Sequence, residues 1–433
     1  MSLLKPEHLK HLPGVDNTLR SVLSNGITLL MHANSDSASV VISGYFQAGS
    51  MYDPPEKLGL AYLTAAALMR GTQTQDFQQI FNRLETAGAS LGFGASVHTV
   101  SFGGHALAED LPLLLDTLAD CLIHPAFPSE HIERMRAQHL TSLAIRAQDT
   151  AEMASLTFDQ ILFAGHPYSL PEDGFPETIQ RITRADLAAF HNQHYHPDGL
   201  VLVVVGAVNP DEVVDQVNAK LGSWEGGPEK NPPDFNLPQP PAQPVRRHVF
   251  IPCKSQVDLV MGGFGPRRID PDYLTASLGN NILGQFGLMG RIGESVRENA
   301  GLAYYASTGL NAWIEGGSWE ITAGVDPANL PKAIDLIREE IRRFVVEPVS
   351  AEELEDSQAF LVGRLPLNME SNMGIAGSLL NIERFSLGLD YYRKYPQMIK
   401  EITSTQILET AQRYLNPERF VIVSAGPQPE DVE

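Results

Sequence analysis

One group of side chains able to bind a metal is a histidine cluster, His191, His194 and His196, in the segment HNQHYH with Asp186 nearby. Imidazole and carboxylate groups are common metal ligands. The three histidines, however, fall at the end of a predicted helix just before Pro197, and a helix C-terminus favours histidine because of the helix dipole. We therefore interpret the cluster as structural and keep a metal site as the alternative.

A second stretch, residues 59–72 with the sequence GLAYLTAAALMRGT, predicts a helix. Its interior, from Leu60 to Met69, has no charged residue and is rich in Ala and Leu, which are strong helix formers. Because it has no polar face, we expect this helix to be packed on all sides. Gly71 and Thr72 follow as a plausible stop. By itself the stretch indicates only a helix of the core.

The frame of this helix resembles that of the pitrilysin/insulinase (M16) zinc peptidases, in particular the short bacterial members and the mitochondrial processing peptidase subunits. Those chains carry G-L-A-H-F-x-E-H-M-x-x-x-G-T here, where two His bind zinc and the Glu activates water. In this sequence Tyr62, Ala65 and Ala66 stand at the first His, the Glu and the second His positions. The family's third ligand, a downstream Glu, matches Ser142, or Thr141 if the register shifts by one. The resemblance implies a peptidase fold, and the replacements predict a chain that holds no zinc cofactor and is inactive alone.

A different family motif is kept in the second half of the chain. In GRIGESVRENAGLAYYAST, residues 290–308, Arg297 and Tyr304 match an Arg and a Tyr that the family places seven residues apart. The resemblance implies that this pair reaches across to a zinc site, holds the substrate backbone and stabilises the oxyanion of the tetrahedral intermediate. The segment predicts a helix that ends near 299–301 and a strand from Leu302, whose alternation sends Tyr304 and Tyr305 to opposite faces. The alternative is that Arg297 is a solvated helix residue and Tyr304 a half-buried strand aromatic.

The loss of the zinc motif together with the retained pair resembles one kind of subunit in heterodimeric bacterial members of the family. The resemblance implies a metal-free subunit that supplies Arg297 and Tyr304 to a zinc-bearing partner with an intact His-x-x-Glu-His, for the hydrolysis of peptides. It also implies a homodimer when the chain is alone. The alternative is a non-catalytic scaffold or a peptide-binding protein of the same fold. The glycine-rich substrate loop of processing peptidase α subunits has a weak match in Gly284, Gly287 and Gly290.

The segment SLGFGASVH, residues 90–98, occupies the place of the family's substrate-pairing edge strand. Its glycines permit close approach of another backbone. The segment is thus a candidate for peptide binding by strand addition, and an ordinary glycine-rich sheet edge is the alternative. The candidate residues are Gly92, Gly94, Ala95 and Ser96.

The chain also contains an internal repeat, which predicts its domain organisation. FHNQHYHPDGLVLVVVGAVNPDEV at 190–213 parallels AQRYLNPERFVIVSAGPQPEDV at 411–432, and a period near half the chain implies duplicated units. Residues 224–244 hold seven prolines and predict a linker. We expect a peptidase-like half at 1–223 with the degenerate zinc motif and a second half at 245–433 with the Arg/Tyr pair. The fold class is α+β in layers: two homologous halves, each a mostly antiparallel sheet covered by helices.

Composition narrows the function and the location. The net charge of −21 argues against nucleic acid as a partner, since phosphate neutralisation needs clustered Lys and Arg. No apolar run approaches the length of a membrane span, so no membrane is expected. Cys121 and Cys253 predict two buried free thiols, and the first residues lack the features of a signal peptide, so we expect a cytoplasmic protein.

Overall fold

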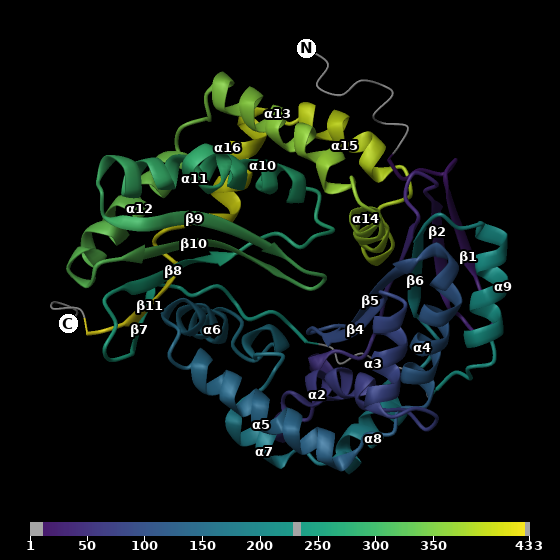
Figure 1. Cartoon of the computed structure of the whole chain (residues 1–433). Helices are drawn as coiled ribbons and strands as arrows, with labels where there is room; N and C mark the ends of the chain where they lie inside the picture. The colour runs from purple at the N-terminus through teal and green to yellow at the C-terminus, as the bar shows by residue number, and fades with distance from the viewer. Residues whose placement is uncertain (1–11, 228–234, 429–433) are drawn as a thin grey trace.

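The computed structural model of the chain describes residues 12–227 and 235–428, which form two β-sheets with helices around them (Figure 1). The first sheet has six strands in the order β1-β2-β6-β3-β5-β4, and the second has five in the order β7-β11-β8-β10-β9. Each sheet is antiparallel except for one parallel pair, β2 with β6 and β11 with β7. The predicted fold class is confirmed.

The strands have the following bounds: β1 Thr18–Val22, β2 Thr28–Ala33, β3 Ser39–Phe46, β4 Ser90–Ala95, β5 Val100–Leu107, β6 Val201–Gly206, β7 Val245–Phe250, β8 Val257–Phe264, β9 Ala303–Ala312, β10 Gly317–Val325 and β11 Val421–Gly426. The helices of the first half are α2 Leu60–Ala67, α3 Phe77–Thr86, α4 Leu111–Ile123, α5 Ser129–Arg146, α6 Thr150–Leu162, α7 Pro176–Arg181, α8 Arg184–His194 and α9 Pro210–Leu221. Those of the second half are α10 Tyr273–Gly284, α11 Phe286–Gly293, α12 Leu330–Phe344, α13 Ala351–Asn368, α14 Asn372–Arg384, α15 Tyr391–Lys400 and α16 Ser404–Tyr414.

The internal repeat in the sequence corresponds to a repeated structural unit. In each half a helix, α8 or α16, leads into an all-buried strand, β6 or β11, that ends in a glycine. Gly206 and Gly426 share an unusual backbone conformation, with φ of 153° and 151°. In both, an added Cβ would lie within 3 Å of the backbone of the neighbouring strand, so only glycine fits. At the ends of β6 and β11, the two halves therefore have the same close approach between neighbouring strands.

Two helices cross between the halves. α6, from the first half, packs on β8 and β11 of the second sheet, where Phe158 and Ala154 meet Val260 and Val421. α14, from the second half, packs on β3 and β6 of the first sheet, where Leu379 is buried. In Figure 1, α6 lies beneath the second sheet and α14 beside the first. Each sheet thus has one face covered by its own helices and the other by a helix of the opposite half.

Several local expectations need correction. α2 is not packed on all sides, because Tyr62 and Ala66 are only partly buried. α13 continues through Pro366 to Asn368, although proline usually ends or kinks a helix. The sequence reading also assigned no element to β7 or to the helices α7, α9, α14 and α15. β7 (VRRHVF) carries adjacent charges, and α15 contains Pro396, so neither shows a clean apolar period.

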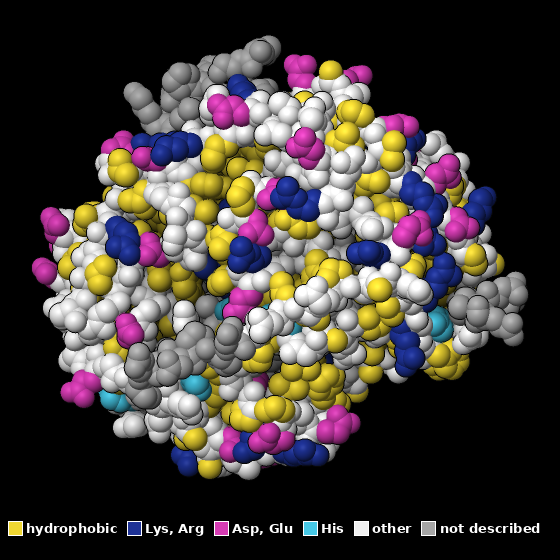
Figure 2. All heavy atoms as spheres, turned by 180° about the vertical axis from the view of Figure 1, so that it is seen from behind, with side chains coloured by type: hydrophobic (Ala, Val, Ile, Leu, Met, Phe, Trp, Pro, Cys, Tyr) yellow, Lys and Arg dark blue, Asp and Glu magenta, His cyan; other side chains and the backbone are white. Residues whose placement is uncertain are grey.

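The surface and the cysteines add two observations. Figure 2 shows acidic and basic side chains interspersed on one face of the molecule rather than gathered by sign. Cys121 is buried as expected, whereas Cys253 is exposed, so the prediction of two buried thiols is wrong for Cys253. In the described part of the chain, no helix combines the length and apolar character needed to cross a membrane.

Candidate functional site

The frame residues around α2 have structural roles that do not depend on metal chemistry. The Asp53 carboxylate accepts hydrogen bonds from the backbone N–H groups of Gly59, Leu60 and Ala61 at 2.8, 3.1 and 2.9 Å. It thus satisfies donors at the first turn of the helix. Gly59 has φ of 93°, and a Cβ there would lie 2.5 Å from Ile179 Cδ1. The residues Gly59, Leu60 and Ala61, which this chain shares with the zinc peptidases, therefore have a role in folding that needs no metal.

The positions of the family's zinc ligands present no metal-binding set. Tyr62 stacks on His139 of α5, with ring centroids 4.6 Å apart and planes at 30°. Ala65 is fully buried and Ala66 half-buried, and neither offers a donor atom. Ser142 is exposed on α5, and its hydroxyl donates to the carbonyl of Gln138 at 3.3 Å. These residues do not fit a zinc ion, which requires several N, S or carboxylate ligands around one point.

His139 and Thr141, which lie beside Ser142 on α5, are also engaged elsewhere. The Nε2 atom of His139 is 2.7 Å from the carbonyl oxygen of Asp173. The hydroxyl of Thr141 donates to the carbonyl of Ala137 at 3.0 Å. Within residues 12–227 and 235–428, no group of three or more His, Cys, Asp or Glu side chains is placed to hold a metal.

The histidine cluster of α8 does not converge on one point. His191 Nε2 lies 2.8 Å from the carbonyl oxygen of Leu122, and burial lowers the pKa of this imidazole. His194 packs between the rings of Phe190 and Tyr52. His196 Nε2 lies 3.1 Å from the carbonyl oxygen of Gln193, its own neighbour on the chain. These contacts support the structural interpretation of the cluster over the metal site.

Arg297 and Tyr304 lie on either side of a sharp turn at the edge of the second sheet. Arg297 belongs to a π-helical turn, Glu294–Asn299, that continues α11, and its guanidinium is 3.5 Å from the Glu298 carboxylate. Gly301, with φ of 64°, ends this turn. Tyr304 then starts the edge strand β9 and is 84% exposed.

The alternation predicted for the two tyrosines of β9 is present. The Tyr305 hydroxyl donates to the Asp258 carboxylate at 2.7 Å and is part of the fold. Tyr304, on the opposite face, is not half-buried. In the chain alone, the ring and hydroxyl of Tyr304 are therefore accessible from outside the fold.

The candidate peptide strand β4 is the other free sheet edge of interest. It pairs only with β5 in the sheet order, and α2 packs beside it. Nothing lies within 4 Å of an added Cβ at Gly92, and at Gly94 only the Ser101 hydroxyl does, at 4.0 Å. Ala95 ends the strand. The hydroxyl of the next residue, Ser96, forms hydrogen bonds with the carbonyl and the hydroxyl of Thr99. β4 is thus an end strand of its sheet, and it stays a candidate for peptide binding by strand addition.

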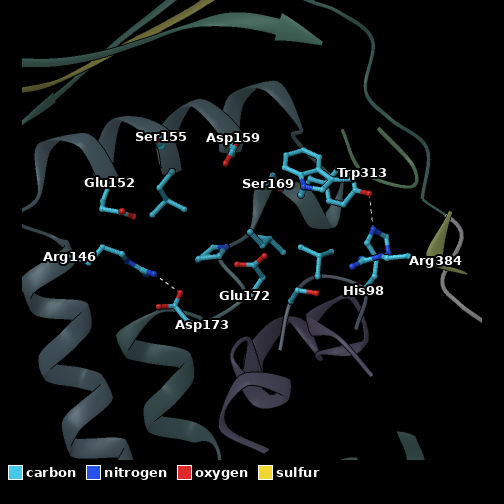
Figure 3. A pocket seen from close by; sticks show the side chains of 16 residues that line it. His98, Arg146, Glu152, Ser155, Asp159, Ser169, Glu172, Asp173, Trp313 and Arg384 are labelled. Carbon is cyan, nitrogen blue, oxygen red and sulfur yellow. Dashed lines mark hydrogen bonds and ion pairs between the residues drawn. The ribbon is translucent and has the colours of Figure 1, made fainter. Parts of the chain in front are cut away.

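A cavity of about 540 Å³ lies between the two halves, next to the end of β4 (Figure 3). Charged and aromatic residues of its lining come from six segments: His98 after β4, Arg146 at the end of α5, Glu152 and Asp159 on α6, Tyr168 and Glu172 in the following loop, Trp313 between β9 and β10, and Arg384 at the end of α14. Sequence reasoning missed these residues. No spacing in the sequence links them, because α6 and α14 come together here only through their exchange between the halves.

Comparison with known proteins places this architecture in a family. Residues 28–166 match the family model described as Insulinase (Peptidase family M16), and residues 181–361 match the model described as Peptidase M16 inactive domain. The chain is an M16-like protein of the short bacterial type. The family resemblance predicted from the α2 frame is thereby confirmed.

M16-like relatives match along nearly the whole chain. An uncharacterized zinc protease of Mycobacterium leprae is 25% identical over 413 residues, covering 94% of this chain and 91% of its own length. An uncharacterized zinc protease of Rickettsia bellii is 25% identical over 402 residues, covering 91% of this chain and 94% of its own length.

Solved structures match in the same way. A crystal structure described as a peptidase M16 inactive domain, from Pseudomonas fluorescens, is 27% identical with a TM-score of 0.88 and covers 95% of this chain and 98% of its own. A protease from Helicobacter pylori has the same fold, with a TM-score of 0.87 at 17% identity, covering 96% of this chain and all of its own.

Proposed function

We propose that this M16-like chain is the metal-free subunit of a heterodimeric zinc peptidase and supplies Arg297 and Tyr304 to the active site of a zinc-bearing partner. The observation that carries the proposal is the 84% exposure of Tyr304 on the edge strand β9, with Arg297 in the helical turn that precedes this strand. In the same chain, Tyr62, Ala65, Ala66 and Ser142 offer no zinc-binding set.

In this proposal the partner provides the zinc, its His-x-x-Glu-His ligands and the general base. The Tyr304 hydroxyl and the Arg297 guanidinium supply hydrogen-bond donors and positive charge where negative charge develops on the substrate carbonyl oxygen. Donors of this kind act by stabilising the transition state more than the bound substrate. The open edge of β4 supports a role in holding an extended peptide next to this centre.

A non-catalytic scaffold or peptide-binding protein is the second candidate. It is supported by the stacked pair of Tyr62 and His139, which fills the place of the family's metal chemistry with ring packing. A cytoplasmic location remains a prediction in either case. The deciding experiment is co-expression with an M16 chain that has an intact zinc motif, followed by a peptidase assay of the purified pair.

The isolated chain is expected to contain no stoichiometric zinc and to hydrolyse no peptide. The physical reason is that two of the ligand positions and the base position carry Tyr62, Ala66 and Ala65, of which the alanines have no donor atom. Elemental analysis and a peptidase assay of the chain alone check this. One tightly held zinc per chain that is lost in a Tyr62→Ala variant would contradict it.

The chain is also expected to form a dimer, with itself when alone and preferentially with a zinc-bearing M16 chain when both are present. The exposed edge strands β4 and β9 would then line one wall of a chamber whose opposite wall comes from the second subunit. Sedimentation equilibrium of the chain alone and of the mixture measures this. If the chain stays monomeric at high concentration and does not bind the zinc-bearing relative, the dimer prediction is wrong and the scaffold candidate is favoured.

A further inference from the structure

The cavity between the halves contains a positive charge without a counter-charge. Arg384, in the last turn of α14, lines the cavity, and its Nε atom is buried without a hydrogen-bond partner. In the described part of the chain no carboxylate forms an ion pair with it. Its nearest charge-stabilising contacts are the rings of Tyr45 and Phe385, 5.9 and 5.8 Å from the guanidinium. Burial lowers the pKa of this guanidinium, which a bound anion would offset.

The neighbouring arginine provides an internal comparison. Arg146 lines the same cavity, but its guanidinium forms an ion pair with Asp173 and donates to the carbonyl of Gly174 at 3.0 Å. It is therefore satisfied by the protein itself. Arg384 differs because its buried Nε atom has no hydrogen-bond partner among the described residues. An arginine in such a place is suited to bidentate binding of a carboxylate or phosphate.

Carboxylates without positive partners line another part of the same cavity (Figure 3). Asp159 on α6 has no hydrogen bond or ion pair with the described residues. Its burial, with Glu320 and Glu172 nearby, raises its pKa to about 8. Burial also raises the pKa of Glu172, in the loop after α6, and the neighbouring Asp173 adds to this effect. A cation placed here would relieve the repulsion among these acids.

The remaining lining of the cavity mixes serines with apolar and aromatic side chains. Trp313 packs on Tyr168 with ring centroids 4.6 Å apart, and the Tyr168 hydroxyl is 2.7 Å from His98 Nε2. Leu156 and Leu170 complete this part of the lining. The volume of about 540 Å³ lies within the range of small-molecule sites. A guanidinium without a counter-charge, acids whose ionised form a bound cation would favour, and apolar side chains together match a ligand that carries both charges.

We propose that this cavity binds a short peptide by its two free termini, with the C-terminal carboxylate on Arg384 and the N-terminal ammonium beside Asp159 and Glu172. This site needs only the chain itself and does not depend on a zinc-bearing partner. It goes beyond the proposed function, because it recognises the ends of a peptide rather than an internal bond. Failure of either proposal leaves the other intact.

Isothermal titration of the full chain, without any partner, tests the proposal with the tripeptide Ala-Leu-Ala in three forms: free, C-amidated and N-acetylated. We expect the free peptide to bind and amidation to weaken binding roughly 10- to 100-fold, as expected for the loss of one member of a buried charge pair. Arg384→Met should weaken binding of the free peptide by a similar factor. The variant should then bind the free and amidated forms equally, since both changes remove the same contact.

Further variants complete the design. Asp159→Asn should weaken binding of the free peptide, and this variant should bind the free and N-acetylated forms equally. Arg364→Met, at an exposed arginine of α13, is the matched control and should bind like the wild type. If Arg384→Met does not fold, Arg384→Lys and the amidated peptide on the wild-type chain still test the contact. Equal binding of free and amidated peptide by the wild type, no binding at millimolar concentration, or tighter binding of inorganic phosphate than of the peptide would each overturn the proposal.

Discussion

Replacement of Tyr304 by phenylalanine is expected to lower the kcat of the heterodimer formed with a zinc-bearing M16 chain by roughly 10²–10³, the cost of removing one oxyanion donor. The KM should change little, because this hydrogen bond strengthens in the transition state. Stability should be unaffected, since the ring is 84% exposed in the chain alone. Arg297→Ala should lower kcat at least as much, and it should also raise KM if the guanidinium holds the substrate backbone.

The neighbouring tyrosine gives a matched control for this measurement. The Tyr305 hydroxyl donates to Asp258 inside the fold, so Tyr305→Phe should cost about 1 kcal/mol of unfolding free energy and leave kcat unchanged. Steady-state kinetics and urea denaturation of the two variants separate the roles. If Tyr304→Phe and Arg297→Ala both left the pair at wild-type rate, the assignment of the Arg/Tyr role would be wrong and the scaffold candidate would become the better one.

Replacement of Phe158 by alanine is expected to reduce the free energy of unfolding by about 3–5 kcal/mol, the usual cost of deleting a fully buried aromatic ring. Phe158 is 0% exposed and joins α6 to the second sheet, where Val260 and Val421 are its neighbours in the core. The loss is large because the substitution leaves a void in the core where α6 of the first half packs on the second sheet. Urea denaturation followed by circular dichroism measures the change.

Phe250→Ala provides the comparison, because this phenylalanine is on β7 of the same sheet but is 59% exposed. Its effect should stay within about 0.5 kcal/mol. Hydrogen exchange should show that Phe158→Ala exposes amides of β8 and β11 in particular. Equal small effects of the two substitutions would mean that the contact between α6 and the second sheet contributes little to stability.

Local structure was largely readable from residue patterns. An Asn-Gly pair is a strong hairpin signal, and Asn25-Gly26 lies between the paired strands β1 and β2, with φ of 90° at Gly26. A continuous apolar run such as that at 200–206 is typical of a strand covered on both faces, and β6 is buried throughout. These signals are short-range, because turn chemistry and side-chain periodicity depend only on neighbours along the chain. Prediction failed where that signal is weak, as in β7 and in the proline-containing helix α15.

The sequence by itself determined the family, the two-half plan and the loss of the zinc ligands, because each is a matter of which residue stands at which position. The sequence alone identifies the replacements at the zinc-ligand and base positions, namely Tyr62, Ala65, Ala66 and Ser142. Their contacts, such as the stacking of Tyr62 on His139, are known only from the structure. The role of Arg297 and Tyr304 stays a prediction. The sequence did not tell how far Tyr304 is exposed.

Only the tertiary structure decided which half each helix covers and what the exchange creates. α6 and α14 each bury apolar side chains, but the hydrophobic effect is not directional, so residue types alone do not specify which sheet these helices cover. Because α6 crosses to the second sheet and α14 to the first, Asp159 and Arg384, far apart in the chain, line the same cavity. Charged residues with no special spacing in the sequence thus become buried groups that lack a counter-charge among the described residues, which is costly.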